Sequence, residues 1–431
     1  MLPRTGCPKL PTEVCERIID YASLKTVRTC SYVCRSWVPR SRRRLFYNVT
    51  LNSSRTASNF KSVLCGSPHF SLGHYVHILS IDYSPGASDR DSDGSIHAVL
   101  RVLPTLLVNL HTLGFYSIDS DVLNPLFFSL ASRFTTVKSL QLKWLDNCSF
   151  REIVRMMNKF ENLEELEIIA GYIDYDDLDP TTIDSSRSHK LKYLKFDHYS
   201  EGIFSDWLVA SNSYQSLSTL DVPFLFGDEL DDLLQKSSQT VQTLRLRVLR
   251  GNLQTIQTLT HYHALQTLSI RLILISVRLL LMMERLGQDV PPNLNVIQLV
   301  IEHPDVVKAF VLGGQVACNK LDELVLNLRP PRPPSLELRY NLPTPKSERN
   351  TYEGMGEETG RPMSNFEADK TWMSILNQGV LRQHLPRLYE RGLVWCSGVL
   401  ATTAYRLAPV APEEWQRKPT DYLGPLLPIP M

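Results

Sequence analysis

The sequence predicts a mixed α/β protein in which a short helical unit precedes a long array of strand–helix repeats. Three observations predict this class. A pattern of the form apolar-x-x-apolar-x-apolar recurs along most of the chain, apolar stripes with helical spacing lie between its copies, and a separate amphipathic stretch occupies residues 10–46. Alternating apolar and polar residues are typical of a half-buried strand, whereas spacings of three and four are typical of an amphipathic helix.

The recurring pattern is found in ten copies, whose first residues are 24 to 34 residues apart when successive start positions are subtracted. The alternating end of each copy predicts a short strand with one buried face. Because one strand and one helix cannot bury their own apolar faces, stacked units have to cover one another. The copies are Val76–Ile81, Leu110–Phe115, Val137–Leu142, Leu163–Ile168, Leu191–Phe196, Leu217–Val222, Val241–Leu246, Leu265–Ile270, Leu294–Leu299 and Leu321–Leu326.

Apolar stripes between the copies predict helices. Ile153, Val154, Met157 and Phe160 form one such stripe, and Ser149 precedes it as a candidate N-cap. We therefore expect strands and helices to alternate along the array.

Over residues 70–330 this pattern and its period resemble the leucine-rich-repeat superfamily. The resemblance implies an irregular solenoid with a parallel sheet on its concave side and helices on its convex side. The chain departs from the family eight residues after the first apolar position, where Leu145, Gly171 and Ile273 replace the usual Asn or Cys. We therefore expect other groups to satisfy the turns.

The amphipathic stretch at residues 10–46 predicts two helices. Thr12 is the candidate N-cap of the first helix, and Glu13 and Glu16 lie in its first turn. Pro39 is expected to end or kink the second helix. The apolar stripes are Val14, Ile18 and Ile19 on the first helix and Val27, Cys30, Cys34 and Trp37 on the second. A unit of about 40 residues has too little core to be stable alone, so it needs a neighbour or a partner.

Three short motifs in this stretch, Leu10-Pro11-x-Glu13-Val14, Ile18-Ile19 and Val33-Cys34-Arg35-x-Trp37, resemble an F-box. The resemblance implies a three-helix unit that binds the Skp-type adaptor of an SCF-type cullin–RING ubiquitin ligase. The link from Asp20 to Thr29 is short and lacks the second Leu-Pro pair of that family. The implied adaptor contacts or supports are Leu10, Pro11, Glu13, Val14, Ile18, Ile19, Val33, Cys34 and Trp37.

Together the two resemblances imply a non-catalytic subunit that recruits a protein substrate to the cullin–RING core, in the cytoplasm or nucleus, without a cofactor. One alternative is a leucine-rich-repeat scaffold with no ubiquitin-ligase role, whose helical cap serves packing only. Another is a repeat-protein regulator or enzyme, such as a GTPase-activating protein, which would need a positioned catalytic Arg or Asn.

In a repeat of this kind the residues between the buried leucines face the concave surface, where we expect the substrate to bind. Copies near the end of the array are basic, so an acidic or phosphorylated segment could pair with them. The alternative is that these side chains are solvated strand faces. The candidate substrate-binding residues are Lys143, Glu165, Glu167, Lys195, Asp197, Arg245, Arg247 and Arg271.

Composition and motifs argue against several other functions. The formal net charge of +1 gives no global attraction to nucleic acid or an acidic membrane. The most apolar window, 268–283, is too short for a membrane span, and residues 1–10 have no apolar stretch of the secretory type. Phosphate-loop, dinucleotide-binding and hydrolase motifs are missing from the sequence.

We interpret several polar clusters as solvated surface and not as metal-binding or nucleic-acid-binding sites. His261 and His263 are interpreted as exposed rather than metal-binding. The acidic run at 174–179 is interpreted as a solvated turn rather than a calcium loop, and Arg42–Arg44 as a solvated face rather than a nucleic-acid contact. The eight cysteines lack zinc-site spacing, which favours free thiols in a reducing compartment.

Changes in composition predict the domain boundaries. Apolar residues around Leu385 and Leu388 predict a helix, and Leu393–Trp395 predict a last strand in a cap that closes the array. The predicted divisions are an F-box at 6–50, repeats at 51–328, a Pro/Gly-rich disordered insert at 329–365, a C-terminal cap at 366–408 and a flexible tail at 409–431.

Overall fold

The computed structural model is described for the residues that form its helices, strands and adjoining turns. These are residues 11–66, 72–82, 93–118, 123–169, 172–174, 188–196, 201–224, 231–248, 259, 261–272, 290–301, 315–328, 334–341, 385–391, 393–400 and 403–406. The chain divides into two compact units, Met1–Val241 and Gln242–Met431.

The first unit begins with three short helices. Their bounds are Thr12–Tyr21 for α1, Leu24–Cys30 for α2 and Val38–Phe46 for α3. Ile19, Val27 and Cys30 form a small core of their own, against which Trp37 and Leu45 pack. The three helices therefore have a separate centre, distinct from the strands that follow.

Three expectations for these helices are wrong. The predicted second helix ends at Cys30 and is followed by turns, and Pro39 lies in the first turn of α3 instead of ending a helix. A proline is tolerated there because the first backbone N–H groups of a helix have no intrahelical partner. Thr12 is the first residue of α1 and Pro11 its N-cap, so no side chain caps this helix.

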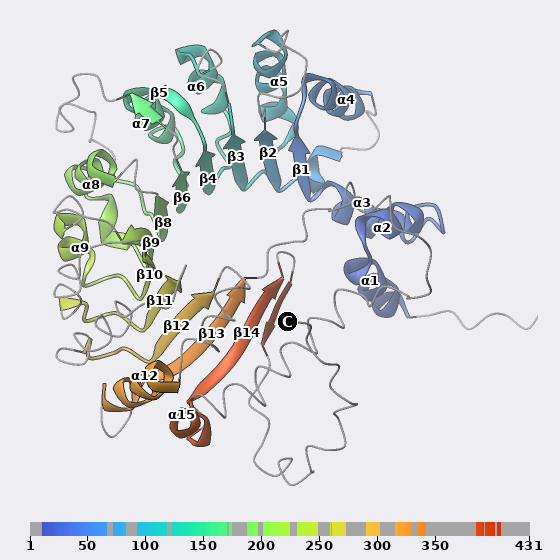
Figure 1. The fold of residues 1–431 in the computed structure, drawn as a ribbon. Coiled ribbons are helices and arrows are strands. Elements are labelled where there is room, and N and C mark those ends of the chain that lie inside the picture. Colours follow the sequence, from blue (N-terminus) through green and yellow to red (C-terminus); the bar gives the residue numbers. More distant parts are fainter. Residues whose placement is uncertain are drawn as a thin grey trace, which may run out of the picture. The chain divides into compact units, whose positions relative to one another are not determined.

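Parallel strands follow the helices and form one sheet in the first unit (Figure 1). The strands are β1 (Asn48–Leu51), β2 (Ile78–Asp82), β3 (Thr112–Tyr116), β4 (Ser139–Lys143), β6 (Glu165–Ile169), β8 (Tyr193–Phe196) and β9 (Thr219–Phe224). Each pairs with the next in parallel. The first six copies of the sequence pattern are thereby confirmed as strands.

The register of this sheet places equivalent leucines side by side. Leu113 on β3 is opposite Leu79 on β2 and Leu140 on β4, and the row continues through β6, β8 and β9. All its members are at most 1% exposed: Leu79, Leu113, Leu140, Leu166, Leu194 and Leu220. Each strand therefore buries its central leucine against its two neighbours.

Helices cover the buried face of these strands (Figure 1). They are α4 (Ser54–Cys65), α5 (Asp93–Leu106), α6 (Pro125–Ala131), α7 (Phe150–Met157), α8 (Glu201–Ala210) and α9 (Asp231–Ser237), with short 3-10 turns at Leu72–Tyr75 and Ser213–Ser216. Aromatic side chains fill the space between helices and strands, as in the contact of Phe115 on β3 with Phe127 on α6 at 4.9 Å between ring centroids. Ser149 is the N-cap of α7, as predicted, but its side chain makes no capping hydrogen bond.

Hydroxyl side chains at the start of some copies bind backbone carbonyl groups of the preceding copy. Thr136 Oγ1 donates to the Leu110 carbonyl at 2.7 Å, and Ser218 Oγ donates to the Lys192 carbonyl at 2.9 Å. A further small sheet, β5 (Asp146–Ser149) paired with β7 (Tyr172–Asp174), was not predicted.

The second unit repeats the parallel arrangement. Its strands are β10 (Thr243–Val248), β11 (Thr267–Leu272), β12 (Val296–Ile301), β13 (Ser335–Asn341) and β14 (Val394–Leu400), followed by the antiparallel β15 (Thr403–Arg406). Its described helices are α12 (Gln315–Asn327) and α15 (Pro386–Glu390). The central row again consists of buried aliphatic residues, namely Leu244, Leu268, Ile297, Leu336 and Val394.

The strand predicted for the tenth copy of the pattern is wrong. Leu321–Leu326 lies in helix α12, not in a strand. Leu321, Val325 and Leu328 are buried at spacings of four and three, which is the period of a helix. The same short pattern fits both periods, and the helical one applies here.

The strand expected at that point lies later in the chain. β13 occupies Ser335–Asn341, inside the segment 329–365 that was predicted as a disordered insert, so that prediction is wrong for these residues. The predicted helix near Leu388 and the predicted strand at Leu393–Trp395 correspond to α15 and β14. The rest of the insert, the helix expected near Trp372 and the tail lie outside the described residues.

A carboxylate joins α12 to α15, the helices described in the second unit. Asp322 on α12 is 1% exposed. Its carboxylate oxygens accept hydrogen bonds from the backbone N–H groups of Arg387 at 3.2 Å and Leu388 at 2.9 Å. These are N–H groups of the first turn of α15, which have no partner within that helix. Asp322 thus caps α15 across more than sixty residues of sequence.

We expect Asp322→Ala to release α15 from α12, because the N–H groups of Arg387 and the buried Leu388 lose their shared acceptor, at a cost of about 2 kcal/mol. Hydrogen exchange at the Arg387 and Leu388 amides should become faster by at least about tenfold. The exposed neighbour Glu323 provides the control, since Glu323→Ala should leave both amides unchanged. Unchanged protection in Asp322→Ala would contradict the capping role.

Candidate functional site

Helix α1 exposes an apolar stripe. Val14 is 41% exposed and Ile18 43% exposed, and Tyr21, which is still more exposed, follows three residues later. Spacings of four and three place these side chains on one face of the helix. We call Val14, Ile18 and Tyr21 the α1 apolar face. At least two fifths of the surface of each of these residues is open to solvent.

Further large apolar side chains next to α1 are exposed as well. They are Leu24 at the start of α2, and Tyr32 and Val33 in the turns after it. The sequence motifs predicted a role for Val33 but not for Tyr21, Leu24 or Tyr32. One feature of the sequence could have identified them: these apolar residues belong to neither of the two predicted apolar stripes, so the predicted helices do not bury them.

The remaining predicted adaptor residues fall into two groups. Ile19 is 1% exposed and Trp37 packs against the same small core, so both support the helices from inside. Pro11, Glu13 and Cys34 are exposed. Leu10 lies outside the described residues. The thiol of Cys34 lies 3.0 Å from Ser36 Oγ, and this hydrogen bond lowers the pKa of Cys34.

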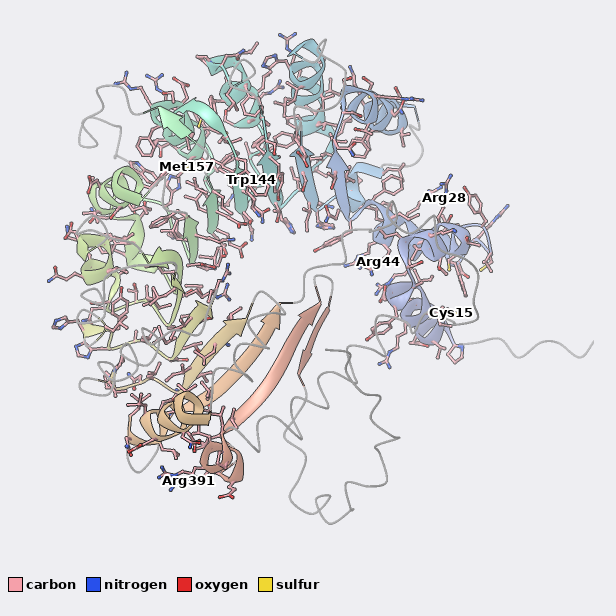
Figure 2. All side chains as sticks on the ribbon, viewed as in Figure 1. Cys15, Arg28, Arg44, Trp144, Met157 and Arg391 are labelled. Atoms are coloured by element: carbon pink, nitrogen blue, oxygen red, sulfur yellow. The ribbon has the colours of Figure 1, made fainter. Side chains whose placement is uncertain are left out.

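An ion pair fixes α1 against α3. Arg40 Nε donates to Asp20 Oδ1 at 2.8 Å, and the Arg40 guanidinium makes a second contact with Asp20 Oδ2. The hydrogen bond from Arg40 lowers the pKa of Asp20, although partial burial opposes this effect. Such a two-point contact sets the angle between the helices, and hence the direction of the α1 apolar face. Figure 2 shows the side chains of the three helices, with Cys15 on α1, Arg28 on α2 and Arg44 on α3 labelled.

A second candidate surface lies on the polar face of the strands in the first unit. The parallel register places Gln141, Glu167, Lys195 and Asp221 in one row across β4, β6, β8 and β9. Glu167 is only 8% exposed. Its two carboxylate oxygens contact two lysines, with Lys143 Nζ at 3.0 Å from Oε2 and Lys195 Nζ in close contact with Oε1.

The lysines determine the charge of Glu167. Burial opposes ionisation, but the charges and hydrogen bonds of Lys195 and Lys143 outweigh it, and the pKa of Glu167 lies below its ordinary value. Beside them, Lys143 Nζ lies 5.3 Å from the ring centroid of Tyr116, whose hydroxyl donates to Gln141 Oε1. Burial raises the pKa of the Tyr116 hydroxyl. The three charged side chains and Tyr116 thus form one connected network.

Gly114 makes room for this network. A Cβ at Gly114 would lie 2.5 Å from Tyr116 Cε2. The missing side chain therefore lets the Tyr116 ring fold over β3 toward Gln141.

The structure brings together some of the predicted substrate-binding residues. Lys143, Glu167 and Lys195 share the network, whereas Glu165 is exposed at the start of β6. Asp197 lies outside the described residues. In the second unit, Arg245 is opposite Ser269, and Arg247 is opposite Arg271 on the neighbouring strand. Arg245 and Arg271 are half-buried and have interactions within the chain.

His261 and His263 are exposed around the buried Tyr262. The described residues include no group of three or more His, Cys, Asp or Glu that could hold a metal ion. Five described cysteines, Cys15, Cys30, Cys34, Cys65 and Cys148, have free thiols. Among the described helices, none has the length and apolar character to cross a membrane.

Comparison with models of known protein families gives no match, and a search of curated proteins gives none either.

We expect Glu167→Gln to lower the free energy of unfolding at neutral pH by about 2 kcal/mol. The reason is that the half-buried Lys143 and Lys195 lose the negative carboxylate that both of them contact. The folded-state pKa of Glu167 is depressed, so its stabilisation is present above the ordinary pKa and is lost as the pH falls through the lower folded value. The difference from the wild type should therefore shrink below about pH 4.

Urea denaturation at several pH values measures this effect. Glu165→Gln is the matched control, because Glu165 lies on the same strand but is exposed, and it should change stability little. A Glu167→Gln difference that is independent of pH would contradict the ion-pair explanation.

Proposed function

We propose that this protein is a non-catalytic, substrate-recruiting subunit of an SCF-type cullin–RING ubiquitin ligase. In this proposal helices α1–α3 form an F-box that binds a Skp-type adaptor, and the strand–helix array is a leucine-rich-repeat solenoid that binds the substrate. The observation that carries the proposal is the α1 apolar face, exposed beside a small core that is complete without it.

The energetics support a protein partner for this face. Fully burying a Val, Ile or similar side chain contributes about 1.5–3 kcal/mol. Val14 and Ile18 are already partly covered, so each still has roughly half of that to gain. Tyr21 and Leu24 add exposed area beside them. Together these side chains offer several kcal/mol to an interface, and contribute little to the fold while they remain in water.

The residues of the F-box motif divide between the exposed face and the small core. The motif residues Val14 and Ile18 are exposed, whereas Ile19 and Trp37 are inside. This division supports an adaptor-binding role, because one part of the motif holds the helices together and the other is open to a partner. A helical cap that served packing alone would turn Val14 and Ile18 toward the strands.

The strand array supports the second half of the proposal. Its rows of buried leucines leave the alternate residues on the opposite face of the sheet, where Lys143, Glu167 and Lys195 are held in fixed positions. A rigid, polar and mixed-charge surface of this type suits recognition of a protein segment. In the proposal this surface binds the substrate, and the ubiquitin chemistry takes place on the ligase core, in the cytoplasm or nucleus.

Binding of the purified full chain to a Skp-type adaptor tests the proposal. Wild type should bind, and Ile18→Asp and Val14→Asp should each weaken binding by at least about tenfold, because a carboxylate at an apolar interface loses its hydration. The readout is the dissociation constant from calorimetry, with circular dichroism to show that the variants are folded.

Val63→Asp is the matched control. Val63 on α4 is 45% exposed, close to the exposure of Val14, but lies outside the three-helix unit. It should bind the adaptor like wild type. A wild-type protein that does not bind, or an Ile18→Asp variant that binds equally well, would favour a repeat scaffold with no ubiquitin-ligase role.

A further inference from the structure

Trp144, the residue directly after β4, combines two unusual properties (Figure 2). Its backbone φ is 52°, in the left-handed region, where a bulky side chain is a genuine outlier. Its side chain is 57% exposed, whereas tryptophan is highly buried on average. The protein thus keeps a large apolar side chain in water on an unfavourable backbone conformation.

The left-handed conformation itself has a clear purpose. Ser117 holds the same place after β3, with a φ of 49°. The Ser117 N–H donates to the Lys143 carbonyl at 2.9 Å, and the Trp144 N–H donates to the Ile169 carbonyl at 2.5 Å. This turn directs each N–H toward the next strand, and Asn or Gly adopts it at the lowest cost. The turn therefore does not require an indole.

Trp144 follows Lys143 at the end of β4, and the polar side chains of β4 and its neighbouring strands already have partners. Glu167 contacts both Lys143 and Lys195, and the Tyr116 hydroxyl is bound to Gln141. The charged groups of this face therefore neutralise one another and offer little net charge to an approaching ligand. The exposed indole is then the main source of binding energy, and it favours an apolar partner group.

We propose that Trp144 anchors the substrate, and that it receives an aromatic or branched aliphatic side chain from a peptide segment of the partner protein. The inference rests on the proposed function, since it names where a substrate would bind. Tryptophan is enriched among the residues that dominate protein interfaces. Its side chain provides a large apolar contact area and loses little conformational entropy.

Selection of phage-displayed random peptides on the full chain provides the probe. The enriched peptides should share an aromatic or branched aliphatic residue. Measured by fluorescence polarisation, Trp144→Asn should weaken their binding by at least about tenfold, and Trp144→Phe should retain most of it. Leu126→Asn is the control, since Leu126 on α6 is 45% exposed in the same unit, and it should bind like wild type.

A stability measurement separates an anchor from a structural tryptophan. Because Asn tolerates the left-handed conformation, the thermal midpoint of Trp144→Asn should stay within about 2 °C of wild type or rise. Loss of a packed aromatic side chain would instead lower the midpoint by more than about 5 °C. That larger fall would overturn the proposal.

Three other results would also overturn it. They are the absence of any enriched peptide, peptide binding that does not depend on Trp144, and Trp144-dependent binding of a fluorescent single-stranded oligonucleotide in place of a peptide. Adaptor binding provides an independent readout, because Trp144→Asn should bind the Skp-type adaptor like wild type. Failure of the anchor is thereby distinguishable from failure of the F-box proposal.

Discussion

The structure depends on one constraint, which is that each central strand residue is buried only by its counterparts on the neighbouring strands and by the helices behind them. Leu140 on β4 is fully covered because Leu113 and Leu166 are aligned with it. In a parallel pair a shift of one residue would turn every such leucine to the opposite face. The register is therefore fixed by burial, and the polar residues between the leucines are fixed with it. The same constraint operates separately in the second unit, around Leu268 and Ile297.

Fixed register brings residues that are far apart in the sequence into one network in space. Lys143, Glu167 and Lys195 come from three different strands, yet alignment brings both ammonium groups to one carboxylate. The arrangement is stable because the two lysines offset the burial of Glu167, as the direction of its pKa shift indicates. A fully solvated network of the same residues would contribute much less. Preorganised charge of this type favours a surface that selects partners by shape and apolar contact more than by net charge.

Periodicity predicted most of the strands, because a buried leucine row requires the same alternation in every copy. It failed at Leu321–Leu326, where a short apolar pattern fits a helix equally well, and at β13, where the flanking prolines concealed the alternation of Leu336 and Leu338. Sequence identified Lys143, Glu167 and Lys195 as members of one polar face. It did not identify Tyr116 or Trp144, because a left-handed backbone and a ring folded over Gly114 are properties of the turn and of the neighbouring strand, not of any local motif.

The three N-terminal helices follow a different rule from the array. Their core is made within the unit by Ile19, Val27 and Cys30, and the Arg40–Asp20 contact sets the helix angle. No burial requirement of the fold therefore acts on Val14 or Ile18, and exchange of either for a polar residue would cost the isolated chain little. An apolar side chain that the fold leaves largely in water, on a helix that packs against the rest of the unit, supports the proposal of a protein partner. The same reasoning applies to Trp144, so two distant surfaces of the first unit lead to the same physical conclusion from independent observations.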